Sequence, residues 1–110
     1  MDNFKNELER ELNIPVALTA FSENTEMPFL IILCDTDTHG SDDKIFFCTQ
    51  EPTLELYTET ADDSCISQLS DFLIKHNLKF SSSTTYIPAE RMFETIYNIN
   101  PINQKTYGVI

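Results

Sequence analysis

The amino-acid sequence predicts an α+β protein with two layers, a mainly antiparallel sheet of about four strands and two helices packed on one face. Two observations favour this class: β-rich runs cluster between two segments of helical periodicity, and another β-rich run follows the second helix. The apolar content, 41% of the 110 residues, is ordinary for a globular protein. We expect residues 1–100 to form a single domain and residues 101–110 to form a C-terminal extension.

Apolar periodicity predicts both helices. The first should span residues 2–12, because apolar side chains recur every fourth position from Phe4. Asn13 suits the left-handed conformation that often ends a helix. The second should begin at a cap within residues 62–64 and end near Asn77. Its apolar stripe is Ile66, Leu69, Phe72 and Leu73.

Strand predictions follow from β-rich composition. Residues 29–34 are apolar throughout, so we expect this strand to be buried on both faces. Pro52 should interrupt the third strand, because proline lacks the N–H donor of a ladder. The Ser/Thr-rich residues 81–85 are expected to form a loop. The predicted strands are 16–21, 29–34, 44–49 resuming at 53–58, and 91–99.

Residues 35–43 are predicted to form an acidic loop. Its start resembles a calcium loop, but its fifth position is His39, and its twelfth is Phe46 where a glutamate is needed. A weak site for a hard cation remains the alternative to a solvated hairpin loop, which we prefer; no metal site is predicted. As candidates for a lumen or partner contact we name Asp35, Asp37, His39, Asp42 and Asp43.

No residue pattern indicates catalysis. Three cysteines without close spacing predict neither a disulfide framework nor a zinc site, and we expect reduced, core-filling thiols. The negative surroundings of Cys34 and Cys48 disfavour a reactive thiolate. Eighteen acidic residues create carboxylate pairs by chance, and two glycines cannot form a phosphate-binding loop. We therefore expect a protein that is not an enzyme and binds no cofactor.

The net charge of −11 restricts the partners. Such a chain binds phosphate backbones and anionic membranes poorly, because both need Lys and Arg. The sequence predicts neither a signal peptide nor a transmembrane helix. The C-terminal extension either frays or docks on a neighbouring subunit as an arm, and we weigh these readings equally. Its candidate contacts are Tyr107, Val109 and Ile110.

Four phrases stand in order along the chain. They are IPVA at residues 14–17, MPFLIIL at 27–33, LELYTE at 54–59 and TYIPAERMFETIY at 85–97. Together they resemble a family of small tail-terminator or tail-completion proteins from long-tailed phages and prophages of Gram-positive bacteria. The resemblance covers residues 14–99, and it rests on the ordered set because no single phrase is diagnostic.

The resemblance implies a structural virion protein of the tail and neck, assembled in the bacterial cytoplasm. Its subunits would form a ring, commonly a hexamer, at the head-proximal end of the tail tube. The ring would end tube polymerisation and contact the tail tube protein and the head–tail connector. DNA would pass without specific binding, since an acidic lumen repels phosphates. The alternative is a small acidic adaptor or DNA-mimic inhibitor that acts on a basic host or phage partner.

Overall fold

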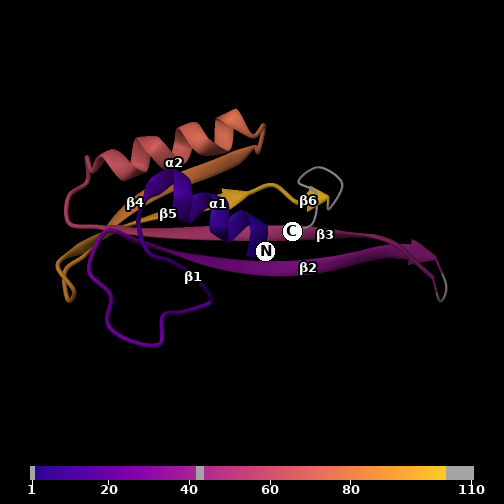
Figure 1. Ribbon diagram of the computed structural model, residues 1–110, viewed down its shortest axis with the longest axis horizontal. Helices are drawn as coiled ribbons and strands as arrows, with labels where there is room; N and C mark the ends of the chain where they lie inside the picture. The colour runs from indigo at the N-terminus through magenta and orange to yellow at the C-terminus, as the bar shows by residue number, and fades with distance from the viewer. Residues whose placement is uncertain (1, 42–43, 104–110) are drawn as a thin grey trace.

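A computed structural model describes residues 2–41 and 44–103, with side chains described for residues 2–35 and 51–101. Two helices and a mixed sheet form an α+β fold, so the predicted class is confirmed (Figure 1). The sheet has a few more strands than the four expected. The elements are α1 (Asp2–Leu12), β1 (Val16–Leu18), β2 (Phe29–Ser41), β3 (Lys44–Thr58), α2 (Ser64–Lys75), β4 (Phe80–Ile87), β5 (Met92–Ile99) and β6 (Ile102–Asn103).

The strands follow the order β1-β2-β3-β5-β4, and β6 pairs with β3. Only the β1–β2 pair is parallel among the described strands; every other pair is antiparallel. The two edges of the sheet are therefore unequal, because β1 has three residues and β4 has eight. The long β4 edge carries six exposed residues in a row and no charged side chain or proline.

The helix boundaries agree closely with the sequence predictions. Asn13 has φ 54° directly after α1, which is the left-handed geometry expected of a terminator. Asp63 caps α2, and its carboxylate accepts a hydrogen bond from the Cys65 N–H at 2.8 Å. That bond satisfies one of the N–H groups that a helix start leaves without an intrahelical partner.

One face of the sheet and both helices enclose the core. Tyr97 of β5 is fully buried, and its hydroxyl donates to the Ile66 carbonyl of α2 at 2.9 Å. Phe4 of α1 and Phe72 of α2 meet with ring centroids 6.0 Å apart. The helices therefore pack on the sheet and on each other. The central apolar side chains are Phe4, Leu8, Leu30, Ile32, Leu54, Leu56, Leu69, Leu73 and Tyr97.

The predicted acidic loop is wrong over most of its length. Residues 35–41 continue β2, which pairs with β3 as far as Ser41 and Lys44. Two neighbouring strands end earlier, since β1 reaches only Ile32 along β2 and β5 reaches only Thr53 along β3. The two strands therefore extend past the helix-covered body as a ribbon (Figure 1). We call residues 35–41 and 44–50 the distal ribbon.

Pro52 does not break β3, so that prediction is also wrong. Pro52 is opposite Cys34 of β2 and buried within a continuous strand. On the other side of β3, the β5 pairs stop at Thr53 and the β6 pairs start at Gln50. Proline is tolerated here because it falls between the two paired segments, where no partner strand needs its missing N–H.

The predicted loop at residues 81–85 is wrong. These residues lie within β4, which pairs with β5 throughout. Residues 102–103, at the start of the predicted C-terminal extension, pair with β3 as β6, and residues 104–110 lie outside the described residues. The first strand is shorter than expected, ending at Leu18 and followed by Thr19 with φ 72°.

Candidate interaction surfaces

The second face of the sheet lacks a helical cover. Along β2, buried Leu30 and Ile32 alternate with Phe29, Ile31 and Leu33, which remain partly or largely exposed. The prediction of a strand buried on both faces is therefore wrong. We call this surface the open face. From β2, β3 and β5 it comprises Phe29, Ile31, Leu33, Asp35, Glu51, Thr53, Glu55, Tyr57, Met92, Glu94, Ile96 and Asn98.

An aromatic row crosses one end of the open face. The Phe21 ring meets Phe29 edge-on at 5.5 Å, and Phe29 stacks on Tyr57 at 5.0 Å. The Tyr57 hydroxyl donates to Glu94 at 2.6 Å and to Glu55 at 3.3 Å. Burial and the hydrogen bond to Glu94 raise the pKa of Tyr57 above its usual range. The phenol therefore stays protonated and holds both carboxylates in place.

A groove lies beside this aromatic row. It measures about 760 Å³ and is bounded by residues 20–27, by β2 and by the turn that leads into β5. Its apolar lining is Ala20, Phe21, Met27, Phe29, Ile31 and Met92, and its acidic lining is Glu23, Glu26, Glu59 and Glu90. We call it the acid-rimmed groove.

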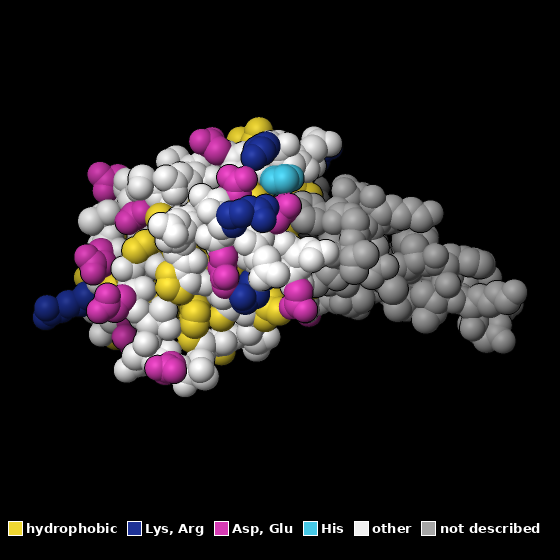
Figure 2. Space-filling model, in the orientation of Figure 1, with side chains coloured by type: hydrophobic (Ala, Val, Ile, Leu, Met, Phe, Trp, Pro, Cys, Tyr) yellow, Lys and Arg dark blue, Asp and Glu magenta, His cyan; other side chains and the backbone are white. Residues whose placement is uncertain are grey.

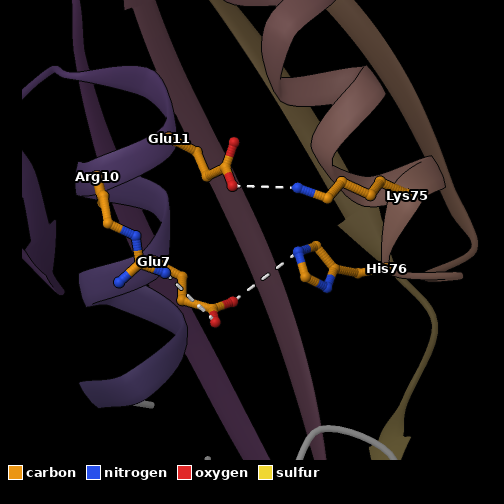
Figure 3. Close-up of polar contacts among 5 residues, drawn as sticks. All are labelled: Glu7, Arg10, Glu11, Lys75 and His76. Carbon is orange, nitrogen blue, oxygen red and sulfur yellow. Dashed lines mark hydrogen bonds and ion pairs between the residues drawn. The ribbon is translucent and has the colours of Figure 1, made fainter.

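Charge is distributed unevenly over the described surface. In Figure 2 acidic side chains are spread across the visible face, whereas most Lys and Arg side chains lie over the helices. Figure 3 shows the ion pairs between the two helices. Lys75 of α2 contacts Glu11 of α1 at 3.2 Å, and His76 Nε2 lies 3.9 Å from Glu7. Arg10 also contacts Glu7, at 3.6 Å. Lys75, His76 and Arg10 are thus engaged by carboxylates of α1.

Three of the predicted site residues fall within the described backbone, and all three lie on β2. Asp35 is an exposed residue at the start of the distal ribbon. Asp37 and His39 belong to the extended backbone of β2, which cannot curl around a cation as a calcium loop does. The remaining predicted contacts lie outside the described residues: Asp42, Asp43, Tyr107, Val109 and Ile110.

The described thiols are poorly suited to nucleophilic chemistry. Burial, together with a hydrogen bond to Asp63, raises the pKa of Cys65 to about 11. Partial burial also raises the pKa of the Cys34 thiol. Cys34 is exposed, so the prediction that it fills the core is wrong. Among the side chains that the structure describes, those of residues 2–35 and 51–101, no three His, Cys, Asp or Glu gather as metal ligands.

The acid-rimmed groove was missed at the sequence level. The alternation at residues 54–57 does indicate a polar second face of β3, with Glu55 and Tyr57 opposite Leu54 and Leu56. The groove itself depends on the return of residues 20–27 to the sheet, for which the sequence carries no periodic signal.

No protein-family model matches the chain, and no curated protein matches it. Within the described part of the chain, neither helix is long and apolar enough to cross a membrane.

Proposed function

We propose that this chain is a structural subunit of a protein assembly. On its sequence resemblance, the assembly is the ring that ends the tail tube of a long-tailed phage or prophage. The ring would contact the tail tube protein on one side and the head–tail connector or neck on the other. One observation carries the proposal of an assembly subunit: the distal ribbon, which extends beyond the body of the fold.

A two-stranded ribbon is at best marginally stable alone in water, because it has no third strand and no covering layer. The described part of the distal ribbon pairs with a third strand only at Thr49 and Gln50, which meet β6. The chain is correspondingly elongated. Its radius of gyration is 14.9 Å, against about 13 Å for a compact chain of this length. A neighbouring subunit would supply the missing cover.

Charge supports the passage of DNA through such a ring. The chain carries 18 acidic and 7 basic residues. A lumen lined by carboxylates repels phosphates, so DNA moves through it without specific binding. The distal ribbon begins at Asp35 and includes Asp37, which makes it our candidate for the lumen or for a partner contact.

Gene deletion tests the virion role. Deleting the gene in its parent phage and imaging the lysate by electron microscopy should reveal unjoined heads beside tails of abnormal length. Normal particles would reject the structural role and favour the alternative of a small acidic binding protein. Tails of normal length that remain unattached would place the protein in the neck as a joining subunit.

A shortened hairpin tests the ribbon directly. Residues 38–48 would be replaced by Asn-Gly, so that the facing residues Asp37 and Thr49 flank a two-residue turn. We expect the body to remain folded by circular dichroism while the variant fails to complement the deletion. Full complementation by this folded variant would show that the distal ribbon is dispensable.

Charge reversal tests the lumen. Replacing Asp37, Asp42 and Asp43 by Lys should impair DNA passage or head–tail joining, because phosphates would then be held by the new cations. Unchanged infectivity would reject the lumen assignment and leave the other parts of the proposal standing.

A further inference from the structure

The acid-rimmed groove combines two kinds of surface that one ligand must match. Its floor is apolar and is formed by side chains from three segments: Phe21 and Met27 before β2, Phe29 and Ile31 on β2, and Met92 on β5. All five are only partly buried. Covering them with an apolar group would release water and stabilise a complex.

The rim has a single sign of charge. Glu23 and Glu26 belong to the segment before β2, Glu59 directly follows β3, and Glu90 lies in the turn between β4 and β5. All four are exposed, and no Lys, Arg or His is among the residues that line the groove. Arg91 is adjacent in sequence to Glu90 but is not part of the lining. The rim therefore repels phosphates and complements cations.

We propose that the acid-rimmed groove binds a segment of another polypeptide in which a large apolar side chain is flanked by Lys or Arg residues. The apolar side chain would rest on Phe29, Ile31 and Met92, and the flanking cations would meet the rim glutamates. This inference rests on the groove alone and holds whether or not the chain belongs to a virion.

The shape and charge of the groove favour this occupant over others. Its volume of about 760 Å³ lies within the range of specific ligand sites, roughly 300–1,000 Å³, which accommodates a few side chains. Nucleic acids and anionic lipids are disfavoured because their phosphates would face four carboxylates. A polypeptide supplies apolar and cationic groups at fixed spacing, as this floor and rim require.

The probe is a fluorescein-labelled synthetic peptide of the sequence Gly-Lys-Lys-Phe-Lys-Lys-Gly, titrated with the full chain and followed by fluorescence polarisation. Two matched peptides serve as controls: one replaces Phe by Ser, and the other replaces every Lys by Glu. We expect saturable binding of the first peptide only, at least about tenfold tighter than either control. When this peptide is added, the largest chemical-shift changes in NMR spectra of the protein should occur at the groove residues.

Charge reversal locates the binding site on the protein. The double variant Glu23→Lys/Glu26→Lys should weaken binding about tenfold, since it removes half of the rim charge and adds repulsion. The control variant Asp2→Lys/Asp71→Lys changes the net charge equally but lies on the helices, and we expect less than about a twofold effect. The variant Glu59→Lys/Glu90→Lys repeats the test with the other two rim glutamates if the first one fails to fold.

Three results would overturn the proposal. Equal binding of the Phe and Ser peptides would show that the apolar floor is not used. If the groove variant and the helix variant weaken peptide binding equally, the binding depends only on the net charge of the protein and not on the groove. Absence of saturable binding by the Phe peptide would remove the docking site altogether.

Discussion

The two faces of the sheet are built from the same strands but differ in how far their side chains are buried. On the helix-covered face Leu54 and Leu56 are fully buried, together with Tyr97 of the neighbouring strand. One residue along each strand, the open face presents Glu55, Tyr57 and other side chains that remain partly exposed. The covered face stabilises the fold, whereas the open face carries aromatic, apolar and acidic groups in positions that a partner can reach. Because side chains alternate along each strand, a buried residue and an exposed one are neighbours in sequence.

Truncating one leucine on each face should give the largest difference. Leu54 is 0% exposed and Leu33, on adjacent β2, is 36% exposed. We expect Leu54→Ala to lower the free energy of unfolding by about 2–5 kcal/mol, because it leaves a cavity in the core. Leu33→Ala should cost less than about 1 kcal/mol. Urea denaturation of both variants measures the difference, and equal losses would show that the open face is covered in solution.

The helix layer should depend on the cap of α2. Replacing Asp63 by Ala removes the acceptor for the Cys65 N–H and should cost about 1 kcal/mol. The neighbouring Asp62, which is exposed and does not cap the helix, is the control. Thermal unfolding followed by circular dichroism compares the two alanine variants. A larger loss for Asp62→Ala would contradict the assignment of the cap.

Tyr57 on the open face should make the free energy of unfolding depend on pH in the alkaline range. The pKa of Tyr57 is raised in the folded protein, so the proton is bound more tightly there than in the unfolded chain. Its contribution to stability is complete below the unfolded value, about 10, and is lost as the pH rises above that value. Tyr57→Phe should therefore show a smaller decline in unfolding free energy above pH 10 than the unmodified chain. Parallel declines would mean that burial and the hydrogen bonds to Glu94 and Glu55 do not raise the pKa of this phenol.

The smallest effect is expected at the contact between the helices. Lys75 and Glu11 are largely exposed, and exposed ion pairs contribute little in water. Lys75→Met should change the free energy of unfolding by less than about 0.5 kcal/mol, with little dependence on salt. A loss comparable to that of Leu54→Ala would show that the helix layer depends on this ion pair and not on its apolar stripe.

The sequence predicts elements that depend on local signals better than elements that depend on pairing with distant strands. The helices were predictable because periodic apolar residues, Asn13 and the Asp63 cap are local signals. The strands over residues 35–41 and 80–87 were not, because their Asp, Ser and Thr residues are typical of loops and pairing with distant strands decides their conformation. Pro52 was misleading for the same reason: its tolerance depends on where β5 and β6 end.

The candidate site was less predictable than the fold. Sequence reasoning placed the contacts at residues 35–43 because charge is concentrated there, but Asp35 and Asp37 lie along a strand. The acid-rimmed groove draws its glutamates from three separate segments, and only the folded chain brings Glu23, Glu59 and Glu90 together. No linear pattern records that proximity.

The β4 edge has a consequence for handling the isolated chain. Its outer row of backbone N–H and C=O groups is bordered by Ser and Thr, without the Lys, proline or bulge that discourages strand-to-strand association. Concentrated solutions should therefore favour lateral growth of the sheet through this edge, ahead of growth through the three-residue β1 edge. A single lysine at Ser83, midway along β4, would be the simplest gatekeeper for keeping purified material monodisperse.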